Sequence, residues 1–330
     1  MRITLTHLKL IIFGSLVLTL ILILFQSVCV SKSYSPKCPE KEGNSSLINS
    51  LSPSSVARNN QLMMIPYREK QPTIYLITPT HSRPEQKAEL TRMGNTLLLV
   101  NSIHWILIED ADSPSELITN FIARLLQLSV NRTNLSITHL VKKTPPEYKT
   151  KLTDPNWLKP RGVLQRNEGL KWLRDNRQSI DHKGVVYFAD DDNTYDVRLF
   201  DEMRDTKRVS CWPVGLVGGL MVERPLVNDD NKVIGWNAVY KPERLYPLDM
   251  AGFAINITLI LRNTKVVFTL KVPRGFQESY LLKQLISDIS ELEPKADKCT
   301  QVLVWHTRTE RPNLKQEIKL KRPSNENIEV

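Results

Sequence analysis

Three consecutive aspartates are the residues of this chain with the clearest potential for chemistry. Asp190, Asp191 and Asp192 directly follow the apolar run 184–189. Such a run is typical of a buried parallel strand, and open α/β sheets bind ligands at the carboxyl ends of their strands. Crowded carboxylates repel one another, and Mg²⁺ or Mn²⁺ prefers oxygen ligands. The pattern predicts a D-x-D metal site that bridges nucleotide phosphates. The alternative is a solvated acidic turn or a helix N-terminus with acidic residues.

Alternating strands and helices would position these carboxylates. Strands are expected at 73–78, 103–108, 136–141 and 184–189, and helices at 86–98, 116–128 and 163–174. This order predicts an α/β fold with a doubly wound parallel sheet. The part after about residue 210 is less regular, with an apolar strand expected at 302–305 and a helix at 279–286. Cys211 and Cys299 lie in strand-like apolar contexts and are expected to be buried thiols.

The N-terminus predicts a membrane anchor. Residues 10–30 carry no charge and could cross a bilayer core of about 30 Å as a helix. Arg2 and Lys9 precede this segment, so the positive-inside rule gives a cytosolic tail at 1–9 and places the remaining chain in the lumen. The alternative is a cleaved signal peptide, whose apolar region is usually shorter. Residues 31–70 are rich in Ser, Asn, Pro and Lys and indicate a flexible stem.

Other features fit a secretory address. N-x-S/T sequons occur at Asn44, Asn131, Asn134 and Asn256. The four cysteines show no zinc spacing, and Cys38 in the stem could bridge two chains. The net charge is +10, but no nucleic-acid-binding motif is present. The positive charge therefore favours anionic small substrates, anionic glycans or acidic lipid headgroups as partners.

Many ordered blocks of the chain resemble the β-1,3-glucuronyltransferases, family 43 of the glycosyltransferases. The resemblance runs from about residue 72 to the end of the chain at 328–330. The matching blocks are 78–80, 160–163, 165–167, 188–195, 212–219, 249–253, 278–279 and 302–310. The resemblance implies a GT-A-type fold, with a Rossmann-like, mostly parallel donor-binding sheet at 71–210 fused to a mixed-sheet acceptor-binding half at 211–330. With the anchor, it implies a single-pass type II Golgi membrane protein whose catalytic domain is lumenal.

The resemblance also implies the reaction. Family members transfer glucuronic acid from UDP-glucuronate to a terminal galactose, with inversion and with Mn²⁺. Glu278 matches the family's base, which takes the proton of the acceptor hydroxyl. Without the resemblance, Glu278 would be a favourable acid in a first helical turn. Asp192 matches the metal ligand, Asp190 would contact the donor, and Asp191 would shape the loop.

The remaining donor and acceptor residues are also implied by matching positions. His81 and Asp110 match the uridine pocket, with His81 standing where some members have a stacking tyrosine. The expected countercharges for the diphosphate and the sugar carboxylate are Arg161, Arg166, His306 and Arg308, and arginine suits bidentate binding of both groups. The residues matching the acceptor site are Glu223, Tyr240, Arg244, Asp249 and, from the tail of a neighbouring subunit, Gln316. That last match implies a homodimer, with Cys38 as a possible bridge.

The acceptor and two other functional classes stay open. The tail around Gln316 favours Gal-β1,3-Gal-β-Xyl of the proteoglycan linkage region, and a broad or HNK-1-type enzyme acting on N-acetyllactosamine is the alternative. A non-catalytic lumenal glycan-binding protein would be expected to lose Glu278 or Asp192, and both are present. A metal-dependent phosphohydrolase would need ligands dispersed over several strand ends, and the six histidines form no cluster in the sequence.

Overall fold

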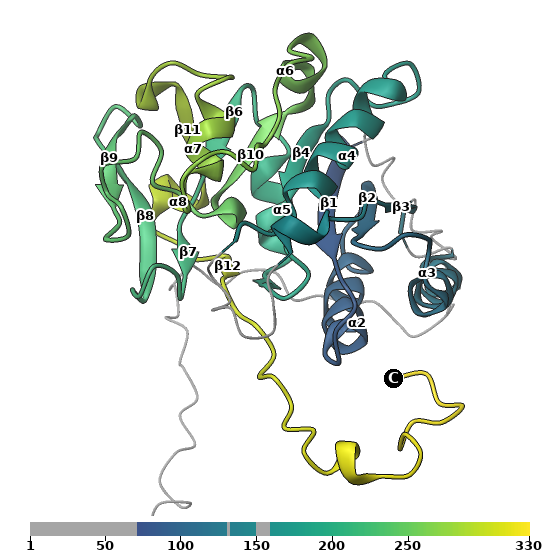
Figure 1. Cartoon of the computed structure of the whole chain (residues 1–330). Coiled ribbons are helices and arrows are strands. Elements are labelled where there is room, and N and C mark those ends of the chain that lie inside the picture. Colours follow the sequence, from purple (N-terminus) through teal and green to yellow (C-terminus); the bar gives the residue numbers. More distant parts are fainter. Residues whose placement is uncertain (1–70, 131–132, 150–158) are drawn as a thin grey trace, which may run out of the picture. The chain divides into compact units, whose positions relative to one another are not determined.

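The computed structural model describes residues 71–130, 133–149 and 159–330. Its main element is a seven-stranded sheet in the order β11-β6-β10-β4-β1-β2-β3 (Figure 1). The strands are β1 (Ile74–Thr80), β2 (Ile103–Glu109), β3 (Leu135–Val141), β4 (Val185–Phe188), β6 (Val209–Cys211), β10 (Phe253–Asn256) and β11 (Leu292–Pro294). Strands β4, β1, β2 and β3 are parallel, whereas β10 runs antiparallel to both β4 and β6. The predicted α/β class with a mostly parallel donor sheet is confirmed.

Helices cover both faces of this sheet, which explains why its strands are continuously apolar. The longer helices are α2 (Gln86–Leu97), α3 (Glu116–Ser129) and α4 (Val163–Asp175). Along β1, Ile74 and Leu76 share one core with residues of α2 and α3, while Tyr75 and Ile77 share another with residues of α4. This alternation is the two-residue period of a strand buried on both faces.

A second sheet has the order β5-β12-β7-β8-β9 and mixes parallel and antiparallel pairs. Its strands are β5 (Thr194–Tyr195), β7 (Val214–Gly215), β8 (Val222–Val227), β9 (Val233–Asn237) and β12 (Val304–Trp305). The short helices are α5 (Arg198–Met203), α6 (Ile257–Arg262), α7 (Gln277–Leu282), α8 (Ala296–Cys299) and the 3₁₀ turns η1 (Pro146–Tyr148), η2 (Met250–Gly252), η3 (Ile289–Glu291) and η4 (Glu317–Lys319).

The two predicted halves share structure, because β10 and β11 from the second half complete the seven-stranded sheet of the first. The described residues all belong to one compact unit by their contacts. A long tail follows β12 and extends away from the sheets before its end returns toward α2 and α3 (Figure 1, yellow).

Three local expectations are corrected. The strand expected at 302–305 reduces to β12, and the helix expected at 279–286 is α7, which begins and ends earlier. Cys299 is buried as expected, but it does not lie in a strand. It ends α8, where positive φ angles from Ala296 to Cys299 give a left-handed turn that alternation of apolar residues cannot predict.

Several predicted features lie outside the described residues: the cytosolic tail, the anchor at 10–30, the stem, and with them Cys38, Asn44 and Asn131. Within the described ranges, no helix has the length and apolar character needed to span a bilayer.

Candidate functional site

The predicted donor residues gather at the carboxyl ends of the parallel strands. His81 follows β1, Asp110 follows β2, and the acid loop 190–192 follows β4. The register pairs Thr80 with Glu109 and Ile77 with Phe188, so these three strand ends meet along one edge. This edge is the expected ligand-binding side of such a sheet.

Asp191 is the structural member of the acid loop. Its carboxylate is buried, accepts a hydrogen bond from Thr80 Oγ1 at 2.7 Å, and forms an ion pair with Arg83 at 2.7 Å. Burial raises the pKa of Asp191, while Arg83 and Thr80 oppose that rise. Both oxygens are thus engaged by residues at the end of β1 or just after it, and these contacts hold the loop against the sheet.

Asp190 is held by one of the predicted donor-binding arginines. Arg166 Nη2 lies 2.5 Å from Asp190 Oδ1, and Arg166 Nη1 donates to the Arg161 carbonyl at 2.9 Å. Gly162 precedes α4 with φ +70°, and a Cβ there would lie 2.7 Å from Arg166 Nη1. A glycine is needed at this position because the left-handed backbone and the arginine leave no room for a side chain. The Nε of Arg166 is buried without a hydrogen-bond partner within the described residues.

Asp192 differs from its neighbours because its carboxylate contacts no hydrogen-bond or ion-pair partner in the described part of the chain. Its carbonyl accepts hydrogen bonds from Arg92 Nη2 at 2.6 Å and Thr307 Oγ1 at 3.1 Å, which aim the side chain. Burial, followed by the charges of Asp190 and Asp191, raises the pKa of Asp192 to about 7. A partly buried carboxylate destabilised by two neighbouring carboxylates fits a cation.

The described residues do not by themselves provide a complete metal site. They contain no group of three or more His, Cys, Asp or Glu side chains arranged to hold an ion. An ion on Asp192 would therefore need most of its ligands from bound phosphates and water, which is the usual arrangement for metals that bind nucleotides.

The two predicted uridine residues differ in how firmly they are held. Asp110 Oδ1 accepts a hydrogen bond from the Thr144 amide at 2.8 Å, and Lys149 Nζ lies 3.6 Å from the same oxygen. His81 is exposed at the end of β1. Desolvation of its ring and the charges of Arg83 and Arg161 lower the pKa of His81, so its imidazole is neutral at pH 7. A neutral ring at a strand end is compatible with stacking on a base.

His306 faces the acid loop from the second sheet. Its amide donates to the Gly215 carbonyl at 2.9 Å, and its Nδ1 lies 3.3 Å from Asp249 Oδ2. The contact with Asp249 is the main reason that the pKa of His306 rises to about 9, and Asp190 and Asp192 add to it. His306 is therefore a cation at neutral pH. Arg308 follows it and is exposed.

Glu278 lies in the first turn of α7. Its Oε2 is buried and lacks a hydrogen-bond partner among the residues that the structure describes. Burial, and then the charge of Asp249, raises the pKa of Glu278 to about 7, while Arg244 and Arg166 oppose the rise. These mutual influences place Glu278, Asp249 and Arg166 in one electrostatic cluster. A carboxylate with a free buried oxygen and a pKa near neutrality is suited to accept a proton.

Among the predicted acceptor residues, Arg244 uses its guanidinium for hydrogen bonds to backbone carbonyls of the same chain. Its guanidinium donates to the carbonyls of Gly275 at 2.8 Å, Tyr240 at 3.0 Å and Lys241 at 3.2 Å. It also lies 5.6 Å from the centre of the Tyr240 ring. Arg244 thus joins the loop of Tyr240 to the turn that precedes α7 and Glu278.

Glu223 and Gln316 lie in different environments. Glu223 is on β8, and its Oε1 is buried without a hydrogen-bond partner inside the described ranges. Gln316 is exposed on the tail, at the start of η4, and contacts no other predicted site residue of the same chain within the described residues. The structure therefore brings Glu223 and Asp249 into electrostatic contact but leaves Gln316 apart from them.

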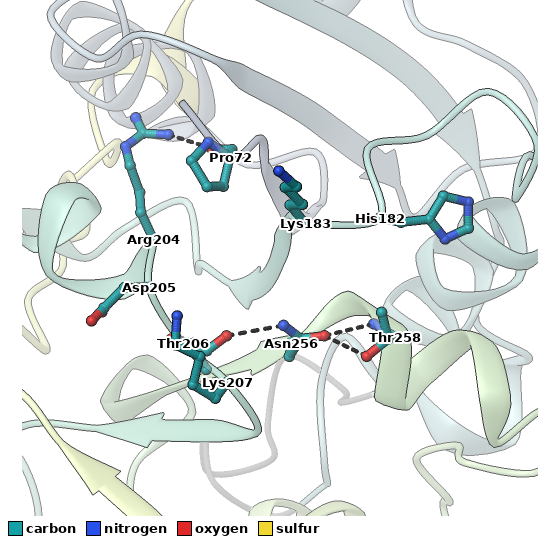
Figure 2. Close-up of a pocket in the computed structure, with 9 residues that line it drawn as sticks. All are labelled: Pro72, His182, Lys183, Arg204, Asp205, Thr206, Lys207, Asn256 and Thr258. Carbon is teal, nitrogen blue, oxygen red and sulfur yellow. Dashed lines mark hydrogen bonds between the residues drawn. The ribbon is translucent and has the colours of Figure 1, made fainter. Parts of the chain in front are cut away.

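The pocket of about 460 Å³ drawn in Figure 2 is separate from this site. It is lined by Pro72 and by residues from 182–183, 204–207 and 256–258, which include no predicted donor or acceptor residue. Figure 2 shows the Asn256 amide directed at the Thr206 carbonyl, while its oxygen faces Thr258.

Sequence reasoning missed the residues of α2 that hold the acid loop. Glu89 is buried on this helix, and Arg92 lies three residues later. One signal in the sequence could have revealed them. Gln86 and Glu89 occupy the same face of the helix as the apolar core positions Leu90 and Met93, where charged residues are uncommon unless they are paired.

Comparisons with known proteins identify relatives of this chain. The family model described as glycosyltransferase family 43 matches residues 93–310. A human protein named galactosylgalactosylxylosylprotein 3-beta-glucuronosyltransferase 1 is 51% identical over 256 residues, which are 76% of this chain and 73% of that one. A Drosophila melanogaster protein named galactosylgalactosylxylosylprotein 3-beta-glucuronosyltransferase I is 50% identical over 249 residues, 74% of this chain and 79% of that one. The solved mannosyltransferase PcManGT from Pyrobaculum calidifontis, in complex with GDP-Man and Mn²⁺, matches with a TM-score of 0.37 and 11% identity over 69% of this chain and 57% of that chain.

Proposed function

The chain belongs to glycosyltransferase family 43, and from this premise we propose that it transfers glucuronic acid from UDP-glucuronate to the 3-hydroxyl of the terminal galactose in Gal-β1,3-Gal-β-Xyl. The human and Drosophila relatives bear the name of a galactosylgalactosylxylosylprotein 3-beta-glucuronosyltransferase. At about half identity over most of both chains, the same class of reaction is the expectation for this chain.

The observation that carries the proposal is the environment of Glu278. Its Oε2 is buried and without a partner among the described residues, and its pKa is raised to about 7. In an inverting transfer, one carboxylate takes the proton from the acceptor hydroxyl while that oxygen attacks the anomeric carbon and UDP departs. Glu278 would hold this proton at the end of the step, and its raised pKa makes it a better base than an ordinary glutamate.

Asp192 is the residue that would hold Mn²⁺. When bound, the ion would supply positive charge to the diphosphate as it leaves. Arg166 and the cationic His306 would bind the donor's negative groups from opposite sides, and His81 and Asp110 would bind the uridine. Asp190 orients Arg166 through their ion pair. Arg161 and Arg308 would add positive charge around the same groups.

The acceptor would occupy the side of the site lined by Glu223, Tyr240 and Asp249. The unpartnered Oε1 of Glu223 can accept a hydrogen bond from a sugar hydroxyl. Tyr240 offers a ring on which a sugar can stack, and Arg244 fixes that ring's loop through the backbone contacts described above. Gln316 would come from the tail of a second copy, which requires a homodimer.

The remaining organisation belongs to the same proposal. Residues 10–30 would anchor the chain as a type II protein of the Golgi membrane, with the catalytic part in the lumen. Cys38 in the stem would link the two copies of the homodimer through a disulfide.

The test is Mn²⁺-dependent transfer from UDP-glucuronate by the full chain in detergent, with Gal-β1,3-Gal and N-acetyllactosamine offered side by side. Transfer to Gal-β1,3-Gal alone is expected. Transfer mainly to N-acetyllactosamine, or equally to both, would replace the linkage assignment with the broad or HNK-1-type alternative. UDP binding without transfer to either acceptor would favour a non-catalytic glycan-binding protein.

A further inference from the structure

One face of α2 contacts both sides of the donor site. Glu89 and Arg92 are three residues apart on this helix, so their side chains leave the same face. Neither residue matches a position assigned to substrate, metal or catalysis above. Both reach beyond their own helix, to the acid loop and to the segment 306–309 that follows β12.

Toward the acid loop, the contacts involve two aspartates. Arg92 Nη2 donates to the Asp192 carbonyl at 2.6 Å. Glu89 forms an ion pair with Arg83, which in turn pairs with Asp191 at 2.7 Å. The backbone of the residue that would hold the metal and the side chain that shapes its loop are therefore both tied to α2.

Toward segment 306–309, the same two residues bind a single threonine. Glu89 Oε1 accepts a hydrogen bond from the Thr309 amide at 3.0 Å. Arg92 Nη1 donates to Thr309 Oγ1 at 3.4 Å. A direct link closes the ring of contacts, because Thr307 Oγ1 donates to the Asp192 carbonyl at 3.1 Å. This segment contains His306 and Arg308.

Helix α2 is well packed, so it can hold these contacts in a fixed position. Leu90, Met93 and Leu97 of α2 are buried in the core beneath the sheet, and Glu89 is 2% exposed. Outer partners of this kind orient the groups that touch a metal or ligand. A contact that only stabilised α2 would not need to end on two separate loops of the donor site.

We propose that Glu89 and Arg92 are positioning residues that set the separation between the metal-binding loop and the His306–Arg308 segment. Through them, the donor diphosphate meets its cation on Asp192 and its protein countercharges at a fixed spacing. This inference rests on the proposed function.

The experiment compares Arg92→Met and Arg92→Lys in the full chain by calorimetric binding of UDP with and without Mn²⁺. Arg92→Met removes both hydrogen bonds and is expected to weaken Mn²⁺-dependent UDP binding by about tenfold. It should raise KM for UDP-glucuronate more than it lowers kcat. Arg92→Lys can still donate to the Asp192 carbonyl but cannot fork to Thr309, so it should restore part of the affinity. Glu89→Gln should have a smaller effect because its amide oxygen can still accept from Thr309.

Arg174→Met is the matched control. Arg174, on α4, also donates to backbone carbonyls, at 2.6 Å to Val266 and 3.3 Å to Asn263, but among the described residues it contacts no donor-site loop. Its loss should lower the unfolding temperature as Arg92→Met does and leave UDP affinity within about twofold. Because Arg92→Lys keeps the charge, it remains informative if Arg92→Met fails to fold.

Each outcome separates the two ideas. If the parent shows no Mn²⁺-dependent UDP binding, the proposed function fails before the variants are considered. If the parent binds and folded Arg92→Met and Arg92→Lys both bind like it, the positioning role is overturned and the proposed function stands. Equal weakening by Arg174→Met would also overturn the positioning role, since a general loss of stability would explain both.

Discussion

Glu278 and Asp192 show how the same side-chain chemistry is set to two tasks by its surroundings. Burial is the largest of the causes that raise the pKa of each to about 7. Beyond burial, Asp192 is influenced mainly by two carboxylates in its own loop, a repulsion that a divalent ion relieves. For Glu278, the charge of Asp249 raises the pKa while the charges of two arginines lower it, so the carboxyl group gains or loses its proton near neutral pH. The first arrangement suits metal binding and the second suits proton transfer.

Replacing Glu278 by Gln should abolish transfer while leaving Mn²⁺-dependent UDP binding within about twofold. The amide keeps the shape of the side chain but cannot accept the acceptor's proton. Transfer by the parent should fall about tenfold per pH unit below about pH 7, as Glu278 becomes protonated. Initial rates from pH 5.5 to 8.5, with UDP affinity measured at each pH, check this. A near-parental rate in the variant would remove Glu278 from the base role.

The same substitution should stabilise the fold at high pH. The pKa of Glu278 is raised from 4.5 in the unfolded chain to about 7 in the folded protein. The folded state therefore binds the proton more tightly, so the contribution of Glu278 to the free energy of unfolding is fully present below about pH 4.5 and is lost as pH rises through 7. Glu278→Gln has no charge to bury and should gain on the order of 1–3 kcal/mol over the parent at pH 8.5, and little at pH 5. Chemical denaturation at both pH values measures this. An equal effect at both would mean that the ionised carboxylate is not strained.

Asp192→Asn should remove the effect of Mn²⁺ on UDP binding. In the parent, EDTA should lower UDP affinity at least tenfold, whereas the variant should bind UDP weakly with or without EDTA. Without metal, the variant should also be more stable than the parent at pH 8, because one of three crowded carboxylates is gone. Calorimetry and thermal unfolding give the two readouts. A variant that still responds to EDTA would place the ion on another residue.

At the scale of elements, the turn between β7 and β8 packs against Glu223, which we propose binds the acceptor. Gly218 and Gly219 have φ angles of +62° and +80°, which side chains disfavour. A Cβ on Gly218 would lie 1.9 Å from Glu223 Oε1, whereas a Cβ on Gly219 would have nothing within 4 Å. The two neighbouring glycines therefore have a similar conformational role but different relations to Glu223.

Gly218→Ala should raise the acceptor KM roughly tenfold by displacing Glu223, with little effect on the KM for UDP-glucuronate. Gly219→Ala is the control, since it should cost a similar 1–2 kcal/mol of stability through its backbone and leave the acceptor KM nearly unchanged. Steady-state kinetics with both substrates varied test the pair. Equal acceptor KM values in the two variants would show that Glu223 does not bind the acceptor.

The N-cap of α6 is the asparagine of one sequon, and this structural role should prevent its glycosylation. Asn256 Oδ1 accepts from the Thr258 amide at 3.0 Å, and its Nδ2 donates to the Thr206 carbonyl at 2.9 Å (Figure 2). Asn134 is exposed and makes no such side-chain contact in the described residues. We expect glycan at Asn134 and none at Asn256. In protein expressed through the secretory pathway, Asn134→Gln should reduce the mass by one glycan. Asn256→Gln should leave the mass pattern unchanged but lower the free energy of unfolding by about 1 kcal/mol, because the helix cap is lost.

At the scale of the whole molecule, the sequence predicted the parallel half well for a physical reason. Strands such as β1 are buried on both faces, so their apolar runs are continuous, and helices such as α2 between them have a regular period. The second half could not be predicted in the same way. Whether β10 enters the sheet antiparallel to β4 depends on distant packing, and the left-handed turn at Ala296–Cys299 has no local signal. The roles of Glu89 and Arg92 depend on where segment 306–309 lies, which no spacing in the chain specifies.

The tail also illustrates information that exists only in the assembled molecule. Its segment 311–322 contains five Lys or Arg and one Glu, and therefore carries a net charge of +4. Its end is fixed on two helices: Glu329 pairs with Lys87 at 3.1 Å and Arg124 at 3.0 Å, and accepts a hydrogen bond from Asn120 at 2.8 Å. A segment tethered at both ends samples fewer conformations than a free one.

Glu329→Ala should therefore make the tail more sensitive to protease without altering the fold. We expect trypsin to cleave within 311–322 several times faster in the variant, while the unfolding temperature stays within about 1 °C, because partly exposed surface ion pairs add little to global stability. Glu326→Ala, which removes only the local pair with Arg322, is the control. In the structure both partners of the clamp belong to one chain, so protection should not depend on protein concentration. Protection that increases with concentration would contradict this and indicate that Glu329 binds α2 and α3 of a neighbouring copy, alongside the exchange proposed for Gln316.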